Sequence, residues 1–76
     1  MKEFLEYIVK QLVDQPDQVT IEEENREDKL ILKVKVAQPD IGKVIGKKGR
    51  TAFALRTLVA AVGMKAGKKA LLEVLD

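Results

Sequence analysis

Glycines and basic side chains alternate within residues 40–50, which makes this stretch well suited to bind an anion. Its members are Gly42, Lys43, Gly46, Lys47, Lys48, Gly49 and Arg50. Gly46 can end one helical segment with a positive φ, and Gly49 stands just before the next helix. The first N–H groups of that helix have no internal partner and, with the helix dipole, attract negative charge. Free amides among four cations predict a clamp for a phosphodiester backbone.

Two other phosphate-binding loops do not fit this spacing. A Walker A loop has four residues between its glycines and then Lys and Ser or Thr, whereas three residues separate Gly42 from Gly46. The Rossmann fingerprint begins with Gly-x-Gly, which the chain lacks. Binding of a nucleoside triphosphate or a dinucleotide is therefore not expected.

The composition argues against catalysis. The 76 residues include no His, Cys or Ser, which excludes a Ser/His/Asp triad, a thiol nucleophile, a disulfide and a Cys/His metal site. A Mg²⁺ site on Glu22–Glu24 is disfavoured because successive strand residues point to opposite faces. We therefore expect no enzyme activity, no cofactor and no metal.

The net charge of +2 conceals a strong asymmetry. Residues 1–28 carry a net charge of −6, whereas residues 29–76 carry +8. The basic part is the candidate surface for a polyanion, although the two halves can also simply attract each other across a solvated surface. No apolar run approaches the ~18 residues of a membrane span and no signal peptide opens the chain, so a cytoplasmic protein without membrane contact is expected.

Apolar periodicity predicts the first three elements. Residues 3–13 carry apolar side chains at helical spacing and predict an amphipathic helix, which Pro16 stops. Alternating apolar residues predict strands over 18–24 and 29–37, joined as a hairpin by residues 25–28.

This hairpin is expected to have one apolar and one charged face. The apolar side chains of its second strand are Leu30, Leu32, Val34 and Val36. On the charged face, Glu22 is expected to lie diagonal to Lys33 as part of a charge ladder. The apolar face needs cover from helices.

The rest of the chain predicts two helices and a last strand. Asp40 is expected to cap the N-terminus of a short helix over 41–45. A long helix is expected over 50–62, ended by Gly63. Residues 70–75 favour a closing strand, with a helix end as the alternative. The order α-β-β-α-α-β describes an α+β two-layer domain, in which a three-stranded sheet has its helices on one face.

At this point the sequence resembles a known family. Gly46-Lys47-Lys48-Gly49 between two predicted helices resembles the GXXG loop of KH domains, which clamps the backbone of about four nucleotides. The element order resembles the type II KH arrangement over the whole chain. Three short runs make the chain most similar to the bacterial KhpA-like proteins, also called the YlqC family: Gln15-Pro16-Asp17, Arg50-Thr51 and Leu55-Arg56-Thr57. Residues 1–76 are therefore expected to form a single KH domain.

The resemblance implies single-stranded RNA as the ligand and a chaperone or regulator as the role. Phosphates would lie on the amides of Lys47, Lys48 and Gly49, with Lys43 and Arg50 beside them. Lys65, Lys68 and Lys69 either extend this basic surface or only solvate a loop. The RNA targets, their sequence preference and the cellular process do not follow from the sequence.

The bases would enter an apolar groove between the helix pair and the sheet. Its floor is expected to include Ile41, Val44, Ile45 and the strand around 30–36, and Gly42 would let RNA come close. Each apolar residue can instead be simple core. The core interpretation is favoured for Leu32, Val34 and Ile45.

A second candidate surface lies on the long helix. The inward stripe is expected to contain Ala52, Leu55, Leu58 or Val59, and Val62. An outer strip at i, i+4, i+7 and i+11 then consists of Phe53, Thr57, Ala60 and Met64. The strip predicts a homodimer, or docking on a second KH-containing protein as the resemblance implies. The alternatives are that Phe53 packs in the core, or that the chain is chiefly a protein-interaction adaptor with minor RNA binding.

Overall fold

The computed structural model describes residues 1–75. Within them the chain forms three α-helices, three strands and three 3₁₀ turns: α1 (Lys2–Leu12), η1 (Pro16–Gln18), β1 (Thr20–Asn25), β2 (Lys29–Lys35), η2 (Gln38–Asp40), α2 (Ile41–Ile45), η3 (Lys47–Gly49), α3 (Arg50–Lys65) and β3 (Lys69–Val74). The predicted order α-β-β-α-α-β is confirmed, and the last segment is a strand. The first strand begins later than predicted because residues 16–18 turn.

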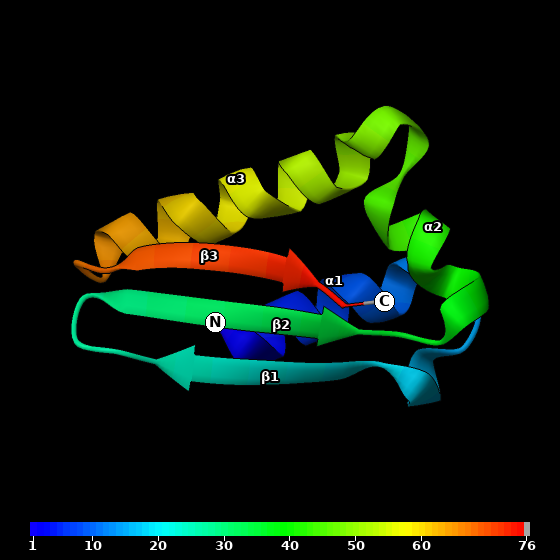
Figure 1. The fold of residues 1–76 in the computed structure, drawn as a ribbon, viewed down its shortest axis with the longest axis horizontal. Coiled ribbons are helices and arrows are strands. Elements are labelled where there is room, and N and C mark those ends of the chain that lie inside the picture. Colours follow the sequence, from blue (N-terminus) through cyan, green and yellow to red (C-terminus); the bar gives the residue numbers. More distant parts are fainter. Residues whose placement is uncertain (76) are drawn as a thin grey trace.

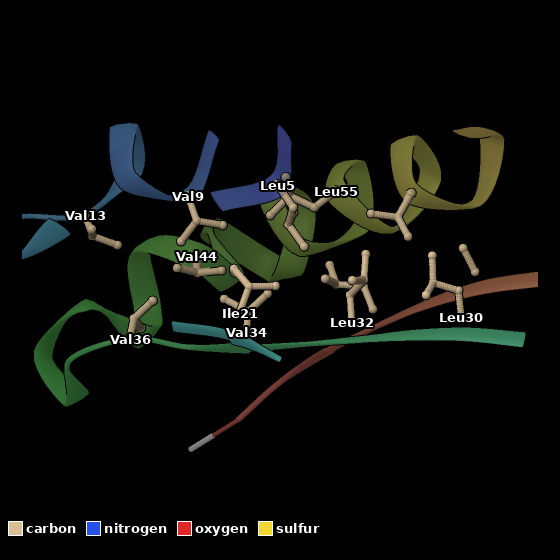
Figure 2. Close-up of a cluster of buried hydrophobic side chains, with 13 residues drawn as sticks. Leu5, Val9, Val13, Ile21, Leu30, Leu32, Val34, Val36, Val44 and Leu55 are labelled. Atoms are coloured by element: carbon tan, nitrogen blue, oxygen red, sulfur yellow. The ribbon is translucent and has the colours of Figure 1, made fainter. Parts of the chain in front are cut away.

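The three strands form one mixed sheet in the order β1-β2-β3. β1 and β2 are antiparallel, with Ile21 opposite Val34, whereas β2 and β3 are parallel, with Leu32 opposite Leu72. A parallel neighbour requires a crossover, and α2 and α3 supply it. The helices lie on one face of the sheet (Figures 1 and 2), as predicted. The chain is therefore a two-layer α+β domain.

The core lies between this face and the helices, as Figure 2 shows. Leu30, Leu32, Val34 and Val36 are all buried, which confirms the predicted apolar face. The helices contribute a second buried set: Leu5, Val9 and Val13 around α1, and Leu55 and Val59 of α3. Alternation in β2 therefore decides which sheet face the helices cover.

The charged face of the sheet differs from the prediction in its register. Glu22 lies directly opposite Lys33 rather than diagonal to it. The diagonal neighbour is Glu24, whose Oε2 lies 3.7 Å from the Lys33 ammonium. A cross-strand ion pair thus forms on this face as expected, but its diagonal partner for Lys33 is Glu24 and not Glu22.

Gly63 does not end the long helix, as the sequence suggested, because α3 continues to Lys65. A Cβ on Gly63 would stand 2.5 Å from the Cβ of Ala70. The glycine therefore marks the place where β3 crosses closely under α3. The turn that follows contains Gly67 at φ +75° and a Lys68 N–H that donates to the Gly63 carbonyl.

Among residues 1–75, no helix combines the length and hydropathy that crossing a membrane requires.

Candidate nucleic-acid interface

The loop between α2 and α3 has an unusual backbone, and it lies at the far end of the molecule from the β1–β2 turn (Figure 1). Three of its four residues have positive φ: Gly46 at +79°, Lys48 at +58° and Gly49 at +75°. The positive φ predicted for Gly46 is confirmed, and Gly49, which stands just before α3 as expected, has a positive φ as well. Lys48 was not foreseen, because a non-glycine residue seldom adopts this conformation.

Gly46 is required by packing as well as by its backbone angle. A Cβ at this position would lie 2.2 Å from Oγ1 of Thr51 and 2.8 Å from the Thr51 amide nitrogen. The loop is thus folded tightly against the first turn of α3. A Cβ on Gly49 would meet nothing within 4 Å, so only its φ demands glycine there.

The loop leaves two of its amides free. The Gly49 N–H donates to the Gly46 carbonyl at 3.1 Å, and the Arg50 N–H donates to the Lys47 carbonyl. Within residues 1–75, the amides of Lys47 and Lys48 donate to no other backbone group. The predicted set of three phosphate-binding amides therefore reduces to these two, because the third closes the turn.

Three of the four predicted cations are free to meet a polyanion. Lys47, Lys48 and Arg50 are exposed and form no ion pair within residues 1–75. Lys43 is engaged instead: its ammonium lies 2.7 Å from Asp14 Oδ2 and 3.3 Å from Asp40 Oδ1. Hydrogen bonds to Asp14 and Asp40 raise the pKa of Lys43 above its ordinary value, despite partial desolvation.

Asp40 is a buried carboxylate, only 1% exposed. It occupies the predicted N-cap position of α2, but its side chain forms no capping hydrogen bond to that helix. Its oxygens accept hydrogen bonds from the amides of Asp14, at 3.3 Å, and Gln15, at 3.0 Å. Burial alone would raise the pKa of Asp40, but these amides and Lys43 outweigh it and hold the pKa below its ordinary value. The carboxylate thereby ties α2 to the segment that follows α1.

The expected apolar floor is only partly on the surface. Val44 is fully buried and belongs to the core, as do Leu32 and Val34. Ile41 is half-buried, whereas Ile45 is exposed, against its favoured core interpretation. Residues 1–75 enclose no pocket, so bases would meet an open surface beside α2.

Gly42 lies on this open surface. A Cβ added there would meet nothing within 4 Å, and its φ is ordinary. No contact among residues 1–75 therefore requires glycine at this position within α2, where glycine costs helix stability.

The outer strip of α3 is exposed, as predicted. Phe53 and Met64 are 70% and 78% exposed, so the alternative in which Phe53 packs in the core is wrong. The Thr57 hydroxyl donates a hydrogen bond of 3.0 Å to the Phe53 carbonyl within the same helix. The buried stripe is Ala52, Leu55, Val59 and Gly63. Leu58 and Val62, which were candidates for it, are exposed.

Two features of the candidate site were not predicted from the sequence. One is the Asp14–Asp40–Lys43 cluster, in which Asp14 lies 26 residues before Asp40 and meets it only after folding. The other is the positive φ of Lys48. Only the placement of Asp40 three residues before Lys43 offered a signal, and we interpreted it as a helix cap.

Comparisons with known proteins agree with this geometry. The family model described as KhpA/KhpB, KH domain, matches residues 2–74. The RNA-binding protein KhpA of Listeria monocytogenes is 49% identical over 76 residues, covering 100% of both chains. The protein of the same name from Chlamydia pneumoniae is 47% identical over all of this chain and 97% of its own. No solved structure matches significantly. The chain belongs to the KhpA/KhpB family of KH domains.

Proposed function

We propose that this protein binds single-stranded RNA through the Gly46–Gly49 loop and acts as a small cytoplasmic RNA chaperone or regulator, without chemistry of its own. One observation carries the proposal: the loop holds two free amides, those of Lys47 and Lys48, among three exposed and unpaired cations. A phosphodiester supplies both the acceptors and the negative charge that this arrangement lacks. The relatives that are named RNA-binding proteins support RNA as the ligand.

Gly42 supports the proposal independently. Because no atom of residues 1–75 would lie within 4 Å of a Cβ on Gly42, its small size serves an approach from outside the protein. RNA that leaves the loop along α2 passes this position, next to the exposed Ile45. The half-buried Ile41 completes the surface proposed for the bases, and Val44 supports it from the core.

The test is fluorescence anisotropy with a labelled single-stranded RNA of about a dozen nucleotides, three times the length that one KH domain clamps. The loop variant is Lys47→Asp/Lys48→Asp. The matched control is Lys29→Asp/Lys35→Asp, which makes the same charge change. Lys29 and Lys35 are the exposed first and last residues of β2, and neither forms an ion pair within residues 1–75.

The loop variant is expected to lose at least about tenfold in affinity, because two charge-assisted contacts are replaced by repulsion. The RNA affinity of the control is expected to stay within about twofold of the wild-type value, since only the long-range electrostatic field of the protein changes. Equal losses in both variants would show that net charge rather than the loop binds RNA. Circular dichroism of each variant checks that the fold is kept.

A second function, protein pairing, is favoured by the outer strip of α3. We propose that Phe53, Thr57, Ala60 and Met64 form the contact of a homodimer or of a complex with a second KH-containing protein. Phe53 and Met64 stand at the ends of the strip with small residues between them, which lets another helix approach closely. Large exposed apolar side chains in such a strip are typical of an interaction surface.

Phe53→Glu tests this pairing. The variant is expected to keep its fold, because Phe53 is exposed, and to sediment as a monomer at concentrations where the wild type dimerises. Tyr7→Glu is the matched control, since Tyr7 is an equally exposed aromatic residue on α1. A wild type that stays monomeric at every concentration, alone and with RNA, would contradict the homodimer.

A further inference from the structure

Two lysines beyond the outer strip have no role in the loop of their own chain. Lys65 is the last residue of α3, and Lys68 lies just before β3, where its ammonium donates to the Asn25 side-chain oxygen. We call Lys65 and Lys68 the tail lysines. The 16 residues of α3 make it about 24 Å long, so the tail lysines and the loop stand at opposite ends of the helix (Figure 1).

The outer strip has the same spacing in either direction. Its steps of four, three and four residues are symmetric about the midpoint between Thr57 and Ala60. A two-fold axis through this midpoint, perpendicular to α3, sets Phe53 against the partner's Met64 and Thr57 against the partner's Ala60. Such self-complementarity is what an isologous dimer requires, and antiparallel helices also oppose their dipoles favourably.

The area of the strip predicts that it pairs weakly by itself. The exposed parts of Phe53 and Met64 present on the order of 300 Å² of apolar surface, which is within the range of the largest apolar patch on an ordinary monomer. A standard interface buries about 800 Å² per partner. The strip alone is therefore too small for a stable dimer, and a further interaction has to stabilise the pair.

Antiparallel pairing brings the N-terminal end of one α3 beside the C-terminal end of the other. Helix axes in contact are about 8–10 Å apart, so the loop lies closer to the partner's tail lysines than to its own. Arg50 and Lys65 project within about 60° of one another around the helix. The two-fold axis keeps that side of both helices on one common surface.

We propose that the RNA site is shared between two copies: the loop cations of one protomer (Lys47, Lys48 and Arg50) and the partner's Lys65 and the partner's Lys68 hold the same RNA strand. The proposal rests on the RNA binding and the pairing proposed above. The juxtaposed cations repel one another until a polyanion lies between them. RNA therefore strengthens the dimer, and by linkage the dimer strengthens RNA binding.

Mixing two defective variants tests the shared site. In a homodimer of the Lys47→Asp/Lys48→Asp variant, every site lacks its loop lysines. In a homodimer of the Lys65→Glu/Lys68→Glu variant, every site lacks its tail lysines. A mixed dimer joins the intact loop of one chain to the intact tail of the other and so regains one complete site. When the variants are mixed in equal amounts, roughly a quarter of all sites become complete. The probe is a fluorescein-labelled oligouridylate of about a dozen nucleotides, as in the loop assay above.

We expect each variant alone to bind at least about tenfold more weakly than the wild type, and the mixture to recover near-wild-type affinity at about a quarter of the capacity. Lys29→Glu/Lys35→Glu is the matched control, because it makes the same charge change but keeps the loop and the tail lysines. By itself it should bind the probe within about twofold of the wild-type affinity. Native mass spectrometry confirms that mixed dimers form.

Three outcomes would overturn the shared site. Mixed dimers that form without recovering affinity would show that loop and tail act within one chain. A tail variant that alone binds like the wild type would remove the tail lysines from the site and leave the loop proposal intact. A wild type that does not bind the probe at all would overturn the proposed RNA binding itself.

Discussion

At the scale of single residues, Lys48 combines a strained backbone conformation with a proposed role in RNA binding. An L-residue in the left-handed region costs about 1–2 kcal/mol, and such strain persists mostly where function uses it. We expect Lys48→Gly to raise the free energy of unfolding by about 0.5 kcal/mol, since glycine removes the strain but adds entropy to the unfolded chain.

RNA affinity should fall in the same Lys48→Gly variant, because one cation is lost from the loop. Urea denaturation and RNA anisotropy on one sample measure the two effects. A variant that is less stable than the wild type would contradict the strain at Lys48. Gly49→Ala is the opposite control: it places a Cβ at a positive φ and should destabilise the protein by about 1 kcal/mol.

Asp40 makes stability depend on pH in the acid range. Its pKa in the folded protein lies below that of the unfolded chain, which is about 3.9. A depressed carboxyl pKa contributes stability that is fully present above the unfolded pKa and is lost as the pH falls through the folded one. We therefore expect Asp40→Asn to be less stable than the wild type at pH 7, with the gap closing below about pH 4.

Urea denaturation at pH 7, 4 and 3 measures the Asp40 effect. Arg26 lowers the pKa of Glu24 by a hydrogen bond and by its charge, so Glu24 also adds to the acid loss of stability. Glu24→Gln is the control that separates this contribution. A gap between Asp40→Asn and wild type that stays constant from pH 7 to 3 would exclude the carboxylate charge as its cause.

The residues of the loop show what the sequence can and cannot predict. The positions of Gly46 and Gly49 in the turn between two helices were predictable, because glycine adopts the positive φ of such a turn more readily than any other residue. The pairing of Lys43 was missed. Its partner Asp14 is distant in sequence, and a cation in a basic stretch gives no sign that a folded neighbour holds it.

At the scale of elements, the crossing of α3 over β3 depends on one missing side chain. Gly63→Ala improves helix propensity by about 1 kcal/mol but sets a Cβ 2.5 Å from that of Ala70. Overpacking costs about 1–3 kcal/mol, so we expect a net loss of stability of up to about 2 kcal/mol.

Thermal unfolding of a small set of variants checks the Gly63 crossing. Gly42→Ala makes the same exchange within α2, where the Cβ meets open space, and should be neutral or stabilising. The pair Gly63→Ala/Ala70→Gly should recover part of the loss, because the clash is removed. A Gly63→Ala variant as stable as the wild type would show that β3 can move away from the helix.

The elements themselves were predictable because their signals are periodic. Alternation in β2 and the 3.6-residue stripe of α1 gave both the type and the buried face of each element. The end of α3 was not predictable, because a glycine that stops a helix and a glycine that permits a crossing look alike in sequence. Only the position of Ala70 distinguishes them.

At the scale of the whole molecule, the charge asymmetry is built into the fold. The acidic residues 1–28 form α1 and β1, whereas the loop and both ends of α3 belong to the basic part. One charge of the acidic part pairs with one of the basic part, since Asp14 forms an ion pair with Lys43. In the shared site proposed above, RNA meets the cations of the loop and the tail lysines at the other end of α3.

This division predicts how salt should weaken RNA binding. For single strands, log Kobs falls against log salt with a slope of about −0.7 per neutralised phosphate. The Phe53→Glu variant, which is expected to be a monomer, offers Lys47, Lys48 and Arg50, so its slope should be about −2. The proposed wild-type dimer adds the partner's two tail lysines, so its slope should approach about −3.5. Lys43→Gln should leave either slope unchanged, because Asp14 and Asp40 already hold that charge. Anisotropy titrations between about 50 and 200 mM salt measure all three slopes. If Lys43→Gln makes the slope shallower by about 0.7, Lys43 exchanges its carboxylates for a phosphate when RNA binds.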